Sequence, residues 1–219
     1  MWRVDVAVDE ADRSEVMDFV AWNGMFDATY RPLMKERWVT FKIALNLFLQ
    51  RHGSVIVETG SERSIGHGWD GDGNSTYLFG EILARYGGRL WTCDINPEHT
   101  AVARRATEQF TSQITYVTDD SVHFLHAFDR PIDLLYLDSM DCPRDGDATI
   151  PQQHNLHELQ AALPHLSPSA VILLDDNWYE NGGKTRLSKR YLAERGWICL
   201  LDSHQSLWMR DECRRPSQG

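Results

Sequence analysis

The chain has 219 residues, and its 22 lysines and arginines stand against 32 aspartates and glutamates, so the formal charge is −10. That length suits one domain, and a hydrophobic content of 42% excludes a disordered acidic tail. The longest apolar stretches are far shorter than the roughly 20 residues of a membrane-spanning helix. A negative surface repels nucleic acid and anionic membranes, so we expect a small-molecule partner and neither of those.

The start of the chain and its cysteines predict a cytoplasmic protein. Residues 1–5 turn acidic at once, unlike the basic and then apolar start of a secretory leader. The four cysteines, Cys93, Cys142, Cys199 and Cys213, include no C-x-x-C pair, so we expect neither a zinc knuckle nor a redox site. Cys93 and Cys199 lie in apolar runs typical of strands, where we expect reduced core side chains.

The first part of the chain, to Gly53, has a helical pattern. Apolar residues recur at helical spacing between Trp38 and Leu49, and Gly53 is a typical helix stop. We interpret residues 1–53 as a helical cap or lid region. A contact between the subunits of a homodimer is the alternative role for this region.

From residue 54 onward, short apolar runs alternate with amphipathic segments. The predicted strands are residues 54–58, 89–94, 115–118, 132–137 and 170–174. The predicted helices are residues 75–86, a segment that starts at Pro97, residues 121–128 and residues 151–163. This alternation predicts an α/β fold, with a Rossmann-like, doubly wound and mostly parallel sheet that has helices on both faces.

The last two predicted strands, residues 197–201 and 206–210, break the alternation. Only four residues separate them, which permits a hairpin but not a parallel crossover. We therefore expect a seven-stranded sheet with an antiparallel C-terminal hairpin. The main domain then covers residues 54–210, and residues 211–219 form a polar tail.

Each of the five predicted parallel strands ends beside a carboxylate. These acids are Glu58, Asp94, Asp119 with Asp120, Asp138 with Asp141, and Asp175 with Asp176. Ligands of open parallel sheets bind beyond the carboxyl ends of the strands, so we expect the acids at one rim. Single acids at strand ends often only cap the next helix, but five in succession indicate a binding site.

Asp94 closes the second strand, and the turn Glu58-Thr59-Gly60 follows the first. This arrangement is typical of a site for the ribose of an adenosine cofactor, because a carboxylate accepts hydrogen bonds from two neighbouring hydroxyls. The loop after the first strand is not G-x-G-x-x-G, and Glu58 would repel the phosphates of a dinucleotide. A cofactor with an amine and a sulfonium centre tolerates acids at this place.

Five segments carry a family resemblance: residues 57–60 (Val-Glu-Thr-Gly), 94–97 (Asp-Ile-Asn-Pro), 119–121 (Asp-Asp-Ser), 135–138 (Leu-Tyr-Leu-Asp) and 173–177 (Leu-Leu-Asp-Asp-Asn). Together they resemble class I S-adenosylmethionine (SAM)-dependent methyltransferases. More narrowly, they are similar to the metal-dependent O-methyltransferase branch, which includes catechol and sugar O-methyltransferases. The resemblance covers about residues 37–210, and it implies methyl transfer to a hydroxyl of a small molecule such as a sugar, a phenol or a natural-product scaffold.

The resemblance also implies the residues that bind SAM. Glu58, Thr59 and Gly60 would line its methionine part, Asp94 its ribose, and Asp120 with Ser121 the edge of its adenine. The complete set that we expect is Glu58, Thr59, Gly60, Ser75, Asp94, Ile95, Asp120, Ser121 and Asp138. The segment 61–74 is longer than the corresponding family loop, so roles inside it stay unassigned.

Asp138, Asp176 and Asn177 are implied as ligands of Mg²⁺ or another divalent cation, with Asp175 as an alternative ligand. Oxygen ligands suit such a hard cation, which would acidify an acceptor hydroxyl and hold it near the methyl donor. Where the branch often carries a Lys or His base, this chain has Asp141. His154 is the alternative base, because histidine titrates near neutral pH.

Two other features leave alternatives open. The glycine pair before Lys184 leads into a predicted helix, which is either a plain helix start or, with Lys184, a site for a substrate anion. For the whole chain, the rival functions are a nucleotide-sugar or NAD-linked Rossmann enzyme and a non-catalytic binding protein on the same scaffold. The missing glycine motif and the terminal hairpin disfavour the first rival.

Overall fold

The computed structural model describes residues 10–65, 68–69, 71 and 74–210, so the tail expected at 211–219 lies outside the described residues. The strands are β1 (Val55–Thr59), β2 (Arg89–Asp94), β3 (Ile114–Thr118), β4 (Ile132–Leu137), β5 (Leu166–Leu174), β6 (Trp197–Asp202) and β7 (Ser206–Arg210). The helices are α1 (Glu10–Thr29), α2 (Arg37–Gln50), α3 (Ser75–Tyr86), α4 (Pro97–Ala106), α5 (Ser121–Ala127), α6 (Thr149–Ala162) and α7 (Arg186–Glu194), with short 3₁₀ turns at Glu108–Phe110 and Leu163–His165.

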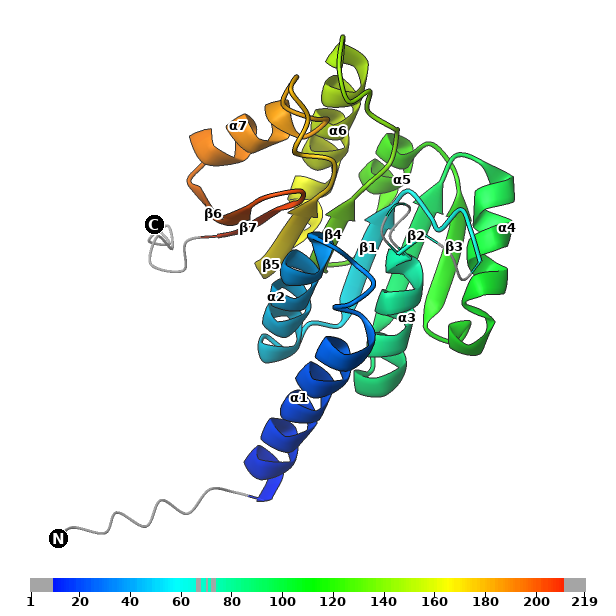
Figure 1. The fold of residues 1–219 in the computed structure, drawn as a ribbon, viewed down its shortest axis with the longest axis vertical. Helices are drawn as coiled ribbons and strands as arrows, with labels where there is room; N and C mark the ends of the chain where they lie inside the picture. The colour runs from blue at the N-terminus through cyan, green and yellow to red at the C-terminus, as the bar shows by residue number, and fades with distance from the viewer. Residues whose placement is uncertain (1–9, 66–67, 70, 72–73, 211–219) are drawn as a thin grey trace, which may run out of the picture.

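The seven strands form one sheet with the order β3-β2-β1-β4-β5-β7-β6 (Figure 1). The first five strands are parallel, and β7 runs antiparallel to both β5 and β6. The predicted seven-stranded sheet with its antiparallel terminal hairpin is therefore confirmed. An all-parallel dinucleotide-binding sheet would have its sixth strand next to the fifth, whereas here β7 takes that place.

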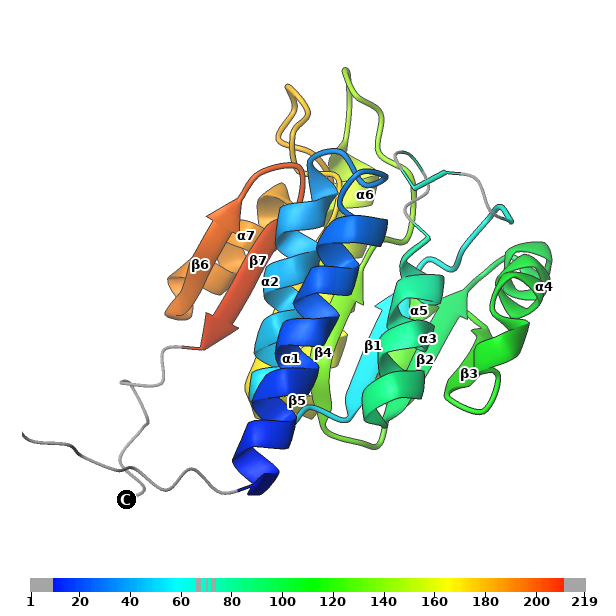
Figure 2. The same cartoon turned by 60° about the horizontal axis from the view of Figure 1, so that its bottom comes forward.

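Alternate residues of the central strands enter two separate cores, one on each face of the sheet. In β4, Leu134 and Tyr136 pack in the first core with α1, α2 and α3, whereas Leu135 and Leu137 pack in the second with α5, α6 and α7. Figure 2 shows α1 and α2 side by side along the first face. Both faces are covered, as expected for a doubly wound parallel sheet.

The aromatic residues of the N-terminal region belong to the first core. Trp22, Phe26 and Tyr30 of this region are buried, and Phe41 of α2 contacts Tyr136 of β4 with ring centroids 5.4 Å apart. The helix α2 packs against β4, β5 and β7. This contact brings the start of α2 to the carboxyl end of β5, where it contributes to the site described below.

The two strand cysteines differ in their surroundings. Cys93 of β2 is buried, as predicted, but Cys199 is exposed. The prediction for Cys199 was wrong because β6 is the edge strand of the sheet, so its apolar run is not covered on both faces.

Within the described ranges, no helix is both long and apolar enough to cross a membrane.

Phe41→Ala tests the first core. Phe41 is fully buried between Phe79 and Tyr136, so we expect the truncation to lower the free energy of unfolding by about 3–5 kcal/mol. Urea unfolding followed by circular dichroism measures this change. Val20→Ala is the control, since Val20 of α1 is 59% exposed and its truncation should change stability by no more than about 0.5 kcal/mol. Equal effects of the two substitutions would contradict the packing described.

Candidate active site

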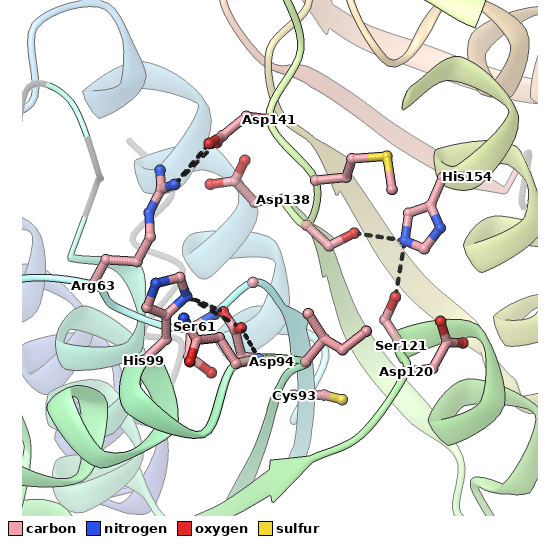
Figure 3. A pocket seen from close by; sticks show the side chains of 15 residues that line it. Ser61, Arg63, Cys93, Asp94, His99, Asp120, Ser121, Asp138, Asp141 and His154 are labelled. Atoms are coloured by element: carbon pink, nitrogen blue, oxygen red, sulfur yellow. Dashed lines mark hydrogen bonds and ion pairs between the residues drawn. The ribbon is translucent and has the colours of Figure 1, made fainter. Parts of the chain in front are cut away.

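A cavity of about 480 Å³ lies beyond the carboxyl ends of four parallel strands (Figure 3). Its lining comes from the segments that follow β1, β2, β3 and β4, together with one side chain of α6. The lining residues are Gly60, Ser61, Arg63, Cys93, Asp94, Ile95, Asn96, His99, Asp120, Ser121, Asp138, Ser139, Met140, Asp141 and His154. Six of the nine predicted cofactor residues and both candidate bases are among them.

Gly60 lets the ends of β1 and β4 approach closely. Its φ is +85°, and a Cβ at this position would lie 2.5 Å from the backbone oxygen of Asp138. The amide of Gly60 donates to the Cys93 oxygen at 2.8 Å, and that of Asp138 donates to the Thr59 oxygen at 2.9 Å. A side chain at position 60 therefore fits neither the backbone conformation nor the space.

Asp94 is held in place at the end of β2. Its carboxylate accepts hydrogen bonds from the backbone amides of Ser61 (3.0 Å) and Asn96 (2.8 Å), and it lies 3.2 Å from Nδ1 of His99. Beside it, the apolar side chain of Ile95 is 72% exposed. A fixed acceptor next to an exposed apolar side chain suits an adenosine group, which presents ribose hydroxyls and a flat base.

His154 of α6 reaches the cavity from the other side. Its Nε2 lies 3.1 Å from the hydroxyls of both Ser121 and Ser139 (Figure 3). Behind it, the buried carboxylate of Glu158 is 3.6 Å from the same nitrogen and accepts a hydrogen bond from Ser139 at 2.6 Å. The contact with Glu158 raises the pKa of His154 above its ordinary value, although burial opposes this shift.

Asp141, the other candidate base, lies at the mouth of the cavity. Both of its oxygens accept from Nη1 of Arg63, at 3.0 and 3.1 Å, and its side chain is 81% exposed. Arg63 therefore engages both oxygens of this candidate base.

Three residues expected at the cofactor are buried and are not part of the cavity lining. Glu58 accepts hydrogen bonds from the hydroxyls of Ser75 (2.5 Å) and Thr76 (2.7 Å) and thereby joins β1 to the start of α3. Burial raises the pKa of Glu58 to about 7. Thr59 is also fully buried. The side chains of Glu58, Thr59 and Ser75 are thus buried behind the cavity, and the cofactor contacts expected of these residues stay a prediction.

Asp138 and Asp176 are joined by a buried lysine. Nζ of Lys184 lies 2.7 Å from Oδ1 of Asp138 and 3.2 Å from Oδ2 of Asp176, and the lysine side chain is 1% exposed. Burial alone would lower the pKa of Lys184, but the neighbouring carboxylates raise it well above its usual value. Burial raises the pKa of Asp138 to about 7, and Lys184 opposes this shift. Lys184 is thus a charged, internal residue whose ammonium already pairs with two carboxylates, which disfavours the alternative of a substrate-anion site.

Asp175 forms a second buried cluster next to the first. It accepts from Nε of Arg37 at 3.0 Å, from Nε2 of Gln205 at 2.9 Å and from the hydroxyl of Tyr136. Burial would raise the pKa of Asp175, but the cations Arg37 and Lys184 hold it well below its usual range. The carboxylate therefore stays ionised inside the protein.

The third predicted metal ligand, Asn177, has both ends of its side-chain amide hydrogen-bonded within the chain. Its amide oxygen accepts from the hydroxyl of Thr185 at 2.6 Å, and its Nδ2 donates to the Ser203 oxygen at 2.9 Å. Of the other two predicted metal ligands, Asp138 and Asp176, each lies against the ammonium of Lys184. Among the described residues, the atoms of Asp175, Asp176 and His204 do lie within 4.8 Å of one another, but Arg37 pairs with both acids.

Sequence reasoning missed five residues that shape the site. They are Arg37, Tyr136, Ser139, Glu158 and Gln205. Tyr136 and Ser139 flank the acidic end of β4 and could have been found from that position. Arg37 is 138 residues away from Asp175, and the sequence around it carries no signal for this pairing.

A family model described as a methyltransferase domain matches residues 71–177. No curated protein matches the sequence. Among similar solved structures, CalS11, a TDP-rhamnose 3′-O-methyltransferase of calicheamicin biosynthesis, has a TM-score of 0.59 at 12% identity, over 93% of this chain and 96% of that chain. The methyltransferase PaMTH1 of Podospora anserina, bound to SAH, has a TM-score of 0.58 at 13% identity over 96% and 100%. The O-methyltransferase NovP has a TM-score of 0.56 at 14% identity over 78% and 77%.

Identities this low are evidence for the fold alone, and the shared fold is the Rossmann-like methyltransferase fold. Residues 71–177 thus match a methyltransferase domain, and the fold is one that methyltransferases share.

Gly60→Ala tests the close approach of β1 and β4. Gly146→Ala is the matched control, because Gly146 has nearly the same φ (+82°) but nothing within 4 Å of the added Cβ. We expect the control to lose about 1 kcal/mol of stability, from the backbone conformation alone, and Gly60→Ala to lose at least about 2 kcal/mol. Urea unfolding of the two variants makes the comparison, and equal losses would contradict the steric argument.

Proposed function

We propose that this chain transfers a methyl group from SAM to a hydroxyl of a small molecule. The observation that carries this proposal is the cavity at the strand ends, where Gly60, Asp94 and Ile95 lie opposite His154. One side of this cavity suits an adenosine group, and the other offers a proton acceptor. The matched methyltransferase domain supports the same conclusion.

The charge of the lining favours SAM over a dinucleotide. Four carboxylates line the cavity: Asp94, Asp120, Asp138 and Asp141. The lining residue with a permanent positive charge is Arg63, and it pairs with Asp141. SAM brings a sulfonium and an ammonium group, which such a lining attracts, whereas a dinucleotide brings phosphates, which it repels.

His154 is the base in this proposal. SAM supplies the methyl carbon; as the acceptor oxygen bonds to it, the carbon–sulfur bond breaks and the acceptor proton passes to Nε2 of His154. This nitrogen faces the hydroxyls of Ser121 and Ser139, which keep it oriented. Glu158 then stabilises the imidazolium that forms. Asp141 is the less suitable base, because Arg63 already binds both of its oxygens.

The acceptor class follows from the same cavity and from the relatives. The cavity is open to a small molecule, and two of the similar structures are named as O-methyltransferases, one of them acting on TDP-rhamnose. A sugar or natural-product hydroxyl is therefore the acceptor to screen first. Mg²⁺ is not part of the proposal, because Lys184 and Thr185 already occupy the oxygens that the expected ligands would offer.

Asp94→Asn tests the cofactor site. The substitution keeps the shape but removes the charge and one acceptor oxygen, so we expect the affinity for SAM to fall at least tenfold, which corresponds to about 1.4 kcal/mol. Isothermal titration calorimetry measures it. Asp119→Asn is the control: this acid follows the neighbouring strand, pairs with His123 and is not part of the cavity lining, so its loss should leave the affinity unchanged. Unchanged affinity in Asp94→Asn would contradict the assignment.

His154→Gln tests the base. We expect the rate of methyl transfer to fall by roughly 10²–10⁴-fold while the affinity for SAM stays within about twofold, because the residue acts on the acceptor proton. Transfer of a radiolabelled methyl group to an acceptor found by screening gives the rate. His157→Gln, on the same helix but outside the cavity lining, should keep the wild-type rate. A His154→Gln variant as fast as this control would exclude His154 as the base.

The pH profile tests how Glu158 acts on His154. A base must be neutral, and the pKa of His154 is raised above its ordinary value near 6.5, so the activity of the wild type should rise with pH and be lost as pH falls through that raised pKa. Glu158→Gln removes the group that raises the pKa, so the acid limb of the profile should move to lower pH. If the acid limb of the profile lies at the same pH in Glu158→Gln as in the wild type, a group other than His154 titrates in this range.

A further inference from the structure

The loop between β5 and α7 places a lysine ammonium between two strand-end carboxylates. Lys184 lies 2.7 Å from Asp138, after β4, and 3.2 Å from Asp176, after β5. Its side chain is almost completely buried, so the ammonium belongs to the interior and does not reach the solvent. This is the position at which the expected divalent cation would have to bridge the same two carboxylates.

The backbone of the loop fixes this lysine in place. Gly183 has φ +64°, and a Cβ there would lie 1.9 Å from the backbone oxygen of Asp176. The amide of Lys184 donates to that same oxygen at 3.1 Å. From α6, Nε2 of Gln152 donates to the oxygens of Gly183 (3.0 Å) and Asn181 (3.1 Å). The loop path is thus determined by close backbone contacts, and Lys184 enters the site as part of that path.

Two cationic side chains of the chain already contact the three carboxylates of the site. Lys184 forms ion pairs with Asp138 and Asp176. Arg37 forms an ion pair with Asp175, and Nη2 of Arg37 lies 3.8 Å from Asp176. A divalent cation binds carboxylate oxygens at roughly 2.0–2.1 Å for Mg²⁺, which would put it against the ammonium that shares those oxygens. Like charges at such a distance repel strongly in a buried site.

The remaining donors do not complete a cation site either. Asn177 uses its amide oxygen to accept from Thr185. His204 lies 3.5 Å from Asp175 and 4.0 Å from Asp176, but the guanidinium of Arg37 contacts both of those acids. Each oxygen that a hard cation needs is therefore held by a cation or a hydroxyl of the chain itself.

We propose that Lys184 replaces the divalent cation in this chain, so that SAM binding and methyl transfer proceed without a metal ion. This inference rests on the proposed function, because it concerns methyl transfer. Its test depends only on the ammonium of Lys184 and the carboxylates of Asp138 and Asp176. Removing the ammonium leaves Asp138 and Asp176 facing an unfilled space. That pair of carboxylates then binds the divalent cation that the wild type does not bind.

Mn²⁺ binding by the full chain, with and without Lys184, tests the proposal. We expect electron paramagnetic resonance to detect no stoichiometric Mn²⁺ site in the wild type, and an excess of Mn²⁺ to leave its Tm unchanged. Lys184→Ala should have a lower Tm, because it leaves two carboxylates without their partner. Mn²⁺ should raise that Tm and bind at one ion per chain, at least tenfold more tightly than to the wild type. In the double variant Lys184→Ala, Asp138→Asn, Mn²⁺ should neither bind at this site nor raise the Tm.

Lys189→Ala is the matched control, since Lys189 forms an ion pair with Asp202 on the outside of α7 and its loss should create no Mn²⁺ site. One Mn²⁺ bound by the wild type and lost in Asp138→Asn or His204→Ala would overturn the proposal. So would a folded Lys184→Ala variant that gains no Mn²⁺. If that variant does not fold, the wild-type titration decides alone. None of these readouts uses SAM, so a failure of the proposed methyl transfer is seen separately, as an absence of SAM binding.

Discussion

The buried ion pairs at the ends of β4 and β5 are the interaction on which the rest of the site depends. Arg37 pairs with Asp175 and joins α2 to the sheet, and Lys184 pairs with Asp138 and joins the loop before α7 to β4. Ions taken out of water are costly, and removing one member of such a pair typically destabilises a protein by about 3–5 kcal/mol. The N-terminal helices and the C-terminal part of the sheet are thus held at one place by charge.

That constraint fixes the floor of the cavity. Asp138 lines the cavity, and its carboxylate accepts hydrogen bonds from Nζ of Lys184 and, at 3.0 Å, from the hydroxyl of Tyr136. Its backbone oxygen lies so close to Gly60 that the first loop must pass without a side chain. The proposed cofactor side and the proposed acceptor side of the cavity consequently share one wall. A methyl transfer needs such a wall, because the acceptor oxygen must be aligned with the carbon–sulfur bond.

The sequence was sufficient for the fold and for the rim of the site. Alternating strands and helices, and the four-residue gap before residue 206, predicted the parallel sheet and its antiparallel hairpin. Acids at strand ends predicted the rim because the topology places all those ends on one edge. The pattern could not tell whether an acid faces the rim or the interior. Glu58 turns inward because Ser75 and Thr76 offer it two hydroxyls, which depends on how α3 packs.

The charges that balance the acids could not be predicted in the same way. Arg37 lies 138 residues from Asp175, and Lys184 lies 46 residues from Asp138. A lysine after two glycines is also typical of a plain loop. Only the path of the backbone between β5 and α7 turns Lys184 inward. The resemblance to a metal-dependent branch therefore predicted the carboxylates but not the cation beside them. The choice between a metal ion and a lysine depends on one loop, which is a tertiary property.

Calorimetric titration of the wild-type protein in EDTA, with SAM and separately with NAD⁺, tests the central claim most directly. The cavity described above predicts one SAM site with micromolar affinity, roughly −8 kcal/mol, that persists without divalent cations, and no binding of NAD⁺. Binding of NAD⁺ but not SAM, or no binding of SAM with or without Mg²⁺, would contradict it.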